Sequence, residues 1–263
     1  MKTILSQSAP DGRNVVERGD ILVFSGQGLK PAEEICAAAR AAATAHGTPS
    51  AEILQQFSVH ALEFMANIFP DYARAWQVEP ASFRVAVPSA APLPVGIELL
   101  PGRALFGSLI LRCSVNVDPT ESFHWVAADP FLRLARREAE NAGLQAFANA
   151  TTSPLHQLRR RMTRYLQKAG VRVIDRSPFD AFMEHFSRWM KANDDWRKRT
   201  KEYSFEFPPG ATWIVFTDVV PHAVVKGGIA LEQTVIVPRE CMANASMAPA
   251  AVLERLAGCS LTA

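Results

Sequence analysis

The sequence lacks the short motifs that mark several large classes of enzyme. It contains no glycine-rich GxGxxG or P-loop run, no GxSxG segment and no HExxH pair. Nucleotide-phosphate binding, serine hydrolysis and zincin-type chemistry therefore have no motif support. Aromatic residues do not alternate with the basic clusters as base stacking would require, so we expect no nucleic-acid partner.

Cysteine is scarce, and long apolar runs are missing. The four cysteines stand far apart without CxxC spacing, which argues against a zinc knuckle and a secreted disulfide scaffold. No segment reaches the roughly 18 uninterrupted apolar residues of a membrane span. No apolar run of signal-peptide length follows Lys2. We expect a cytoplasmic protein without a transmembrane segment.

Charge is nearly balanced overall, but it is unevenly distributed. The formal net charge is +2, and a hydrophobic content of 48% with 21% charged residues is typical of a folded globular protein. Basic residues cluster within residues 159–172 and 191–201. These clusters indicate either solvated helix faces or a docking surface for an anionic substrate or a membrane, and both interpretations stay open.

Strand patterns occur on both sides of a helical region. Apolar β-type runs cover residues 21–24, 83–87, 95–100 and 108–117, and residues 203–238 show a compact series of strands and tight turns. Helical spacing covers residues 32–45, 51–76 with a break at Pro70, 130–147, 154–168 and 178–190. This order fits a barrel whose two halves meet across an insert.

No linker, internal repeat or low-complexity segment divides the chain, so we expect one domain over residues 1–263. Its N-terminal helical part covers about 20–78, and its barrel strands cover about 82–118 and 203–238. The helical insert covers about 130–192.

His222 has the surroundings of a metal ligand. It follows a polar turn at the start of a predicted strand, where a barrel presents one member of a 2-His-1-carboxylate iron site. The other five histidines lie in predicted helices or loops and are most simply surface or core residues: His46, His60, His124, His156 and His185.

Residues 207–218 (FPPGATWIVFTD), together with His222 and residues 231–234 (LEQT), resemble the C-terminal signature of the Kdo hydroxylase family, where Kdo is 3-deoxy-D-manno-oct-2-ulosonic acid. The resemblance covers about residues 20–238. It also includes GDILVF at 19–24, ASFR at 81–84, Leu111-Arg112 with NVDP at 116–119, and SPFDAFM at 177–183.

The resemblance implies a mainly β, cupin-like double-stranded β-helix (jelly roll) with N-terminal and inserted helices. It further implies an oxidoreductase that uses Fe(II), 2-oxoglutarate and O2 to hydroxylate or otherwise oxidise a sugar acid or another small polar substrate. An anionic sugar acid and a lipid-linked sugar are both implied as partners, and peripheral membrane contact stays open.

One ligand position departs from the family pattern. The family carries a His-x-Asp pair, and counting back from Pro119 without a gap places Gly96 at the histidine and Glu98 at the aspartate. Glu98 and His222 are then the implied metal ligands, and one histidine is missing. Iron bound weakly with water or His124 in the gap, an altered chemistry, and a catalytically silent binding protein are three open outcomes.

A 2-oxoglutarate carboxylate needs a cation, and a bidentate arginine suits it best. Arg112 is the first candidate and Arg84 the second, although either one also fits a surface position at a strand edge. Thr217 and Asp218 fit either support of the ligand histidine or a simple turn. We expect Trp213 and Phe216 to lie in the barrel core.

Overall fold

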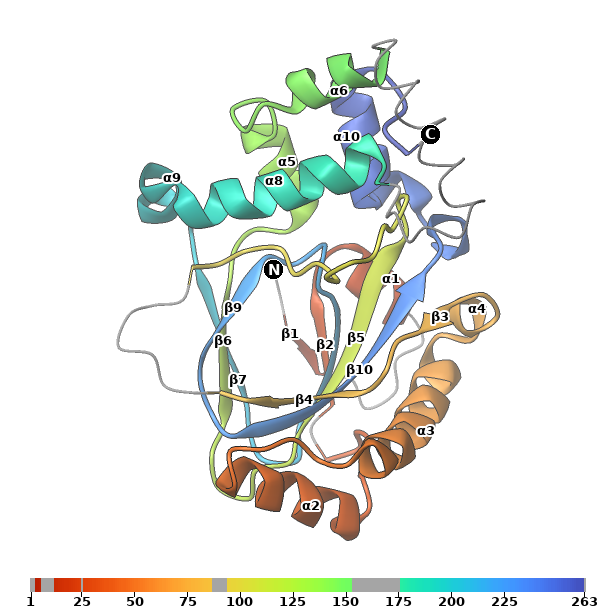
Figure 1. Cartoon of the computed structure of the whole chain (residues 1–263), viewed down its shortest axis with the longest axis vertical. Helices are drawn as coiled ribbons and strands as arrows, with labels where there is room; N and C mark the ends of the chain where they lie inside the picture. The colour runs from red at the N-terminus through yellow and green to blue at the C-terminus, as the bar shows by residue number, and fades with distance from the viewer. Residues whose placement is uncertain (1–2, 6–11, 25, 87–93, 153–175, 263) are drawn as a thin grey trace, which may run out of the picture.

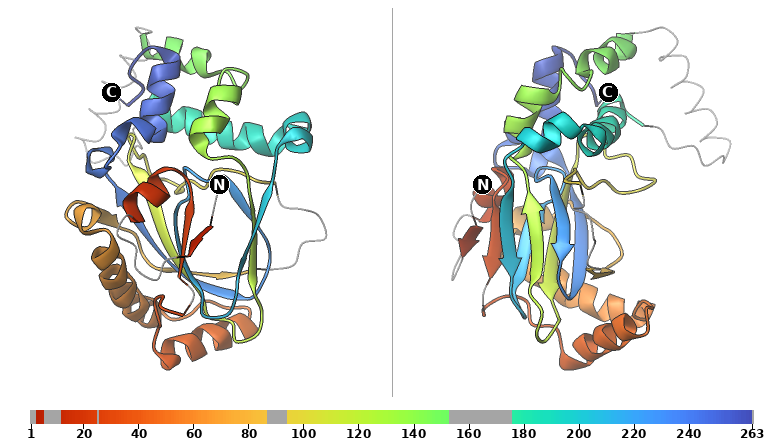
Figure 2. Two further views of the ribbon diagram at one scale, coloured as in Figure 1. Left: turned by 180° about the vertical axis from the view of Figure 1, so that it is seen from behind. Right: turned by 90° about the vertical axis from the view of Figure 1, so that its left-hand side faces the viewer.

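The computed structural model describes residues 3–5, 12–24, 26–86, 94–152 and 176–262. In this part of the chain the strands form a seven-stranded and a three-stranded sheet, and helices gather at both ends of the strands (Figure 1). The two sheets lie side by side, as a view turned by 90° shows (Figure 2). Strands therefore precede and follow the helical insert, as the sequence predicted.

The larger sheet has the order β1-β2-β8-β5-β10-β3, and β4 also pairs with β10. All of its pairings are antiparallel except that of β1 with β2. Its strands are β1 (Thr3–Leu5), β2 (Ile21–Phe24), β3 (Gln77–Val78), β4 (Ser82–Val85), β5 (Leu109–Asn116), β8 (Thr212–Phe216) and β10 (Ile229–Val237). The smaller sheet has the order β7-β6-β9, from β6 (Phe123–Ala127), β7 (Tyr203–Phe207) and β9 (His222–Lys226).

An aromatic core fills the space between the two sheets. Trp213 of β8 stacks on Phe207 of β7 with ring centroids 4.2 Å apart, and Trp125 of β6 packs edge-on against both. Phe216, also on β8, belongs to the hydrophobic cluster on the opposite face of the sheet. Both side chains are fully buried. The prediction that they lie in the barrel core is confirmed for Trp213 and is wrong for Phe216, which packs near Tyr72 on the helix-covered face of the sheet.

Helices cover the larger sheet and one end of the barrel. The described helices are α1 (Gly12–Glu17), α2 (Glu33–Thr44), α3 (Ala51–Ile68), α4 (Pro70–Ala73), α5 (Phe131–Glu138), α6 (Leu144–Thr152), α8 (Pro178–Ala192), α9 (Asp194–Arg199) and α10 (Pro249–Ala257), with short 3-10 turns at Arg239–Cys241 and Ala245–Met247. Helices α2 and α3 pack on β10, whereas α5, α6, α8 and α10 gather at the other end (Figure 1). None of these helices is both long and apolar enough to cross a membrane.

Local sequence signals explain several helix ends. Ser50 caps α3 by accepting a hydrogen bond from the Ile53 amide, and Pro70 opens the separate short helix α4. Ser177 and Asp180 form a reciprocal capping box at the start of α8. The predicted helix at 154–168 lies outside the described residues.

One predicted strand is wrong, and several described elements were not predicted. Residues 95–100 form no strand, because only Gly96 pairs, with His222, while the Ile97 carbonyl accepts a hydrogen bond from Ser187 of α8. Strand β1 and helix α1 were not predicted. Strand β6 and helix α10 were not predicted, and β6 is a five-residue segment that gains its stability from pairing on both sides.

Candidate active site

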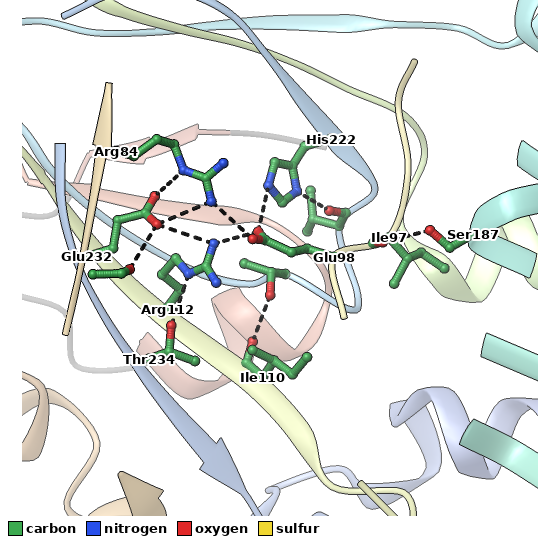
Figure 3. Close-up of polar contacts among 12 residues, drawn as sticks. Arg84, Ile97, Glu98, Ile110, Arg112, Ser187, His222, Glu232 and Thr234 are labelled. Atoms are coloured by element: carbon green, nitrogen blue, oxygen red, sulfur yellow. Dashed lines mark hydrogen bonds and ion pairs between the residues drawn. The ribbon is translucent and has the colours of Figure 1, made fainter. Parts of the chain in front are cut away.

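The extended segment at 95–100 lies beside the first residue of β9. The Gly96 amide donates to the His222 carbonyl at 3.2 Å, and the His222 amide donates to the Gly96 carbonyl at 3.0 Å. In an extended chain, residues two apart point to the same side, so Glu98 projects on the side where a residue-96 side chain would. The Glu98 Oε2 and His222 Nε2 atoms consequently lie 3.5 Å apart (Figure 3).

Two contacts fix the orientation of the His222 ring. Its Nδ1 lies 2.8 Å from the Val220 carbonyl oxygen. Because a carbonyl only accepts, Nδ1 donates its proton in this bond, and Nε2 is the ring nitrogen left to face Glu98. The ring also stacks on Trp125, with centroids 4.1 Å apart and planes inclined by 14°. The basic nitrogen of His222 is thus directed at Glu98.

Two arginines from neighbouring strands reach the same carboxylate. Arg112 of β5 donates to Glu98 at 2.5 Å, and Arg84 of β4 donates to the other Glu98 oxygen at 3.1 Å. Both also contact Glu232 of β10, Arg84 through Nε at 3.1 Å and Arg112 at 3.5 Å. Arg112 is held further by a 3.1 Å hydrogen bond to Thr234. Two guanidiniums and two carboxylates therefore form one closed network (Figure 3).

This network determines the charge state of Glu98. Burial alone would raise its pKa, but the hydrogen bond to His222 and the positive charge of Arg112 outweigh burial and hold the pKa of Glu98 below its usual range. Burial likewise would lower the pKa of Arg84, yet the charges of Glu232 and Glu98 raise it. Glu98 is therefore an ionised carboxylate.

The Glu98 and His222 pair fits two ligands of a shared cation. Ligand atoms that lie about 2.1 Å from one ion are roughly 3–3.5 Å apart, which matches the observed separation. A carbonyl bond on the remote ring nitrogen is also the usual support of a metal-bound histidine. Within the described residues, no group of three His, Cys, Asp or Glu side chains could hold a metal, so neither His124 nor another such residue completes the pair.

Thr217 and Asp218 hold β5 and do not touch His222. The Thr217 amide and hydroxyl both donate to the Ile110 carbonyl, and Asp218 Oδ1 accepts from the Ile110 amide at 3.1 Å. Asp218 Oδ2 is buried without a hydrogen-bond partner, and burial raises the pKa of Asp218 to about 7. These residues form the turn between β8 and β9, one of the two roles that the sequence allowed.

The structure brings all four sequence-predicted site residues together: Arg84, Glu98, Arg112 and His222. It adds contributors that sequence reasoning did not assign to the site. Glu232 lay within the family-like stretch 231–234, but nothing marked its carboxylate as the partner of both arginines. Trp125 and Lys191 come from β6 and α8, and no sequence pattern links either segment to His222.

Comparison with known proteins identifies the family. A model of the family described as 3-deoxy-D-manno-oct-2-ulosonic acid (Kdo) hydroxylase matches residues 26–260. The chain belongs to the Kdo hydroxylase family. It is therefore an oxidoreductase related to Kdo hydroxylases, as the residues around His222 suggested. A search of curated proteins finds no match.

Solved structures of the Kdo hydroxylase KdoO, a non-heme Fe(II) alphaketoglutarate-dependent dioxygenase, have the same fold. The complex with succinate and Fe(III) matches with a TM-score of 0.77 and 20% identity over 100% of this chain and 97% of that one. The complex with alphaketoglutarate (2-oxoglutarate) and Fe(III) gives 0.76 and 20% over 99% and 96%. An apo structure gives 0.76 and 20% over 99% and 97%. The predicted cupin-like fold is confirmed.

Proposed function

We propose that this Kdo hydroxylase family member is an oxygenase that uses Fe(II), 2-oxoglutarate and O2 to hydroxylate Kdo or a related sugar acid. The observation that carries the proposal is the family match over residues 26–260. The iron and 2-oxo acid in the KdoO structures support the same cofactors here. A catalytically silent homologue, the alternative that the sequence left open, is not favoured.

Glu98 and His222 are the proposed ligands of the iron. The support is local: the ionised Glu98 carboxylate lies 3.5 Å from His222 Nε2, beside a cavity of about 370 Å³. Gly96 is the proposed counterpart of the family's first ligand histidine, so the chain supplies two ligands where three are usual. When bound, iron with its 2-oxo acid supplies the oxidising power for attack on a C–H bond.

Arg112 and Arg84 are the proposed holders of the 2-oxoglutarate carboxylate, with Arg112 the more buried. In the structure both guanidiniums are occupied by Glu98 and Glu232. A Glu98 carboxylate that turns toward a cation gives up contacts to both arginines. Because a guanidinium has five N–H donors in a fixed fork, the freed donors suit a second carboxylate in the same place.

Substrate and location are finer points of the same proposal. The net positive charge around the cavity favours an anionic substrate. A lipid-linked sugar, with peripheral contact to a membrane, is part of the same proposal and is tested by an assay with a lipid-bound substrate. The basic cluster at 159–172 lies outside the described residues, and the cytoplasmic location stays a prediction.

One anaerobic experiment tests the proposal. The purified protein is mixed with Fe(II) and 2-oxoglutarate, the visible charge-transfer band of the complex is recorded, and O2 is then admitted while succinate is measured. We expect a band and succinate formation, both reduced at least tenfold in His222→Ala and in Glu98→Gln. If the protein gives no band and forms no succinate above a metal-free control, the oxygenase proposal is ruled out.

A further inference from the structure

The cavity beside Glu98 and His222 has a second wall formed by helix α8. It is lined there by Lys191, and on the other sides by Arg84, Gly96, Glu98 and His222. Ser187, one turn before Lys191 on α8, donates a 2.8 Å hydrogen bond to the Ile97 carbonyl (Figure 3). Residues four apart share one helix face, so this bond also fixes where Lys191 approaches the segment at 95–98.

Lys191 occupies the space that a side chain at position 96 would need. A Cβ built on Gly96 would lie 2.5 Å from Lys191 Cε and 3.4 Å from Lys191 Cγ. Real side-chain atoms do not approach so closely, so the glycine is what allows the lysine stem to lie here. Since the stem is flexible, any larger residue at 96 would push Lys191 away before it moved the backbone.

The charges around the cavity do not cancel. Arg84 and Arg112 are both paired with Glu98 and Glu232, whereas Lys191 makes no ion pair with any Asp or Glu of the described chain. One ammonium is thus left without an internal counter-ion at the mouth of the cavity, which favours an anionic ligand.

We propose that Lys191 is the residue that binds the carboxylate of the sugar-acid substrate, and that Gly96 is present to admit it. The inference rests on the proposed function, which it extends by naming the group that recognises the acid. Lysine suits this role as a movable point charge with three donors, which can follow a carboxylate on a flexible ring. The two buried arginines are left for the co-substrate.

The test compares a charged with an uncharged ligand by calorimetry at low salt. Wild type, Lys191→Met and Lys191→Arg are titrated with Kdo and with its methyl ester, metal-free and with Mn(II) plus 2-oxoglutarate. The comparison is made in whichever state the wild type binds more tightly. We expect Lys191→Met to weaken Kdo binding about tenfold, as loss of one charge-assisted hydrogen bond implies, with the ester affected less than twofold and Lys191→Arg retaining most affinity.

Two further variants separate the charge from general effects. Gly96→Ala should displace Lys191 and weaken Kdo binding by a similar factor, and the double variant with Lys191→Met should show no additional loss. Lys201→Met is the matched control, because Lys201 lies over the Tyr203 ring and does not line the cavity.

A failure of the Lys191 proposal can be distinguished from a failure of the oxygenase proposal. Equal Kdo binding by wild type and Lys191→Met overturns the role of Lys191 and leaves the oxygenase proposal standing. A wild-type protein that does not bind Kdo in either state overturns both the subsite and Kdo as the substrate, while the succinate assay reports separately on the oxygenase chemistry.

Discussion

The indole of Trp125 lies flat against the imidazole of His222, with 4.1 Å between the ring centroids. Trp125 belongs to β6 and His222 to β9, and the two strands are directly paired. The indole also packs edge-on against the rings of Phe207 and Trp213. The proposed metal ligand therefore has one whole face fixed by the aromatic core between the sheets.

Replacing Trp125 should weaken metal binding by His222 in a protein that still folds. Trp125→Leu removes the stack and leaves a cavity, for which we expect about 3 kcal/mol of lost stability and about tenfold weaker Mn(II) binding. Trp125→Phe keeps an aromatic ring and should lose less than half as much of each. Urea unfolding and the electron paramagnetic resonance signal of free Mn(II) measure the two effects. Unchanged Mn(II) affinity in Trp125→Leu would show that the stack does not orient a ligand.

A histidine at position 96 should tighten metal binding, and the gain should be larger when Lys191 no longer occupies the space for its side chain. We expect Mn(II) affinity to increase from wild type to Gly96→His, and again in Gly96→His with Lys191→Ala, because the second change clears the space that Lys191 Cε now fills. Lys191→Ala alone is the control for lost charge repulsion. If the double variant binds no better than Lys191→Ala, Gly96 is not the counterpart of the missing ligand.

Removing Arg112 should cost more than removing Arg84. The Arg112 side chain is 6% exposed, and its loss leaves Glu98 and Glu232 to share Arg84, so Arg112→Met should lower the free energy of unfolding by about 3 kcal/mol. Arg84 is 36% exposed, and solvent screening should reduce the cost of Arg84→Met to about 1 kcal/mol.

A second substitution tests that explanation. Glu232→Gln added to Arg112→Met should recover part of the stability, since it removes one of the two carboxylate charges that Arg112 had paired. Urea denaturation at pH 7 gives all four values, and a double variant less stable than Arg112→Met would contradict the account.

Asp218 should make the protein less stable as pH rises from about 4 to 7. Its pKa is raised to about 7 in the folded state, from 3.8 when unperturbed, so the folded chain holds a proton that the unfolded chain releases in this range. The stabilisation is complete below pH 4 and is lost as pH rises to 7, at up to about 1.4 kcal/mol per unit.

Asp218→Asn isolates this contribution. Its side-chain carbonyl can still accept the hydrogen bond from the Ile110 amide, while the amide group has no charge to bury. We expect a flatter dependence of the unfolding free energy between pH 5 and 8, measured by urea denaturation. A variant with the wild-type slope would assign the pH dependence to other groups.

The sequence predicted most of what depends on local patterns. The break at Pro70 and the helix starts at 51 and 178, directly after Ser50 and Ser177, were predicted correctly because capping and proline geometry act within a few residues. The strands flanking the insert were also predicted, since β5, β8 and β10 are buried on both faces and are rich in aliphatic and aromatic residues. The segment at 95–100 is also strand-like in composition, but it does not have a paired strand on each side as β5, β8 and β10 have. Composition alone does not reveal which segments will be paired.

The candidate site was predictable only as far as family-like motifs reached. His222, Glu98, Arg112 and Arg84 were found from such stretches, and the structure brings them within contact distance. The pairing of Arg84 with Glu232 joins residues 148 positions apart, and the contact of Lys191 with position 96 crosses from a helix to an extended segment. Both depend on how the sheets close.

That closure has a consequence for biosynthesis. A growing chain that has emerged only as far as α8 carries Arg84, Glu98 and Arg112 but lacks His222 and Glu232. Such a chain holds two guanidiniums with one of their carboxylates, and β10, which brings Glu232 and pairs with β4 and β5, is still to come. Pairings across such long sequence separations are the slow steps of folding. The site is therefore completed only after β10 has paired, and the capacity to bind an anion or a cation there reports that the two halves of the barrel have closed.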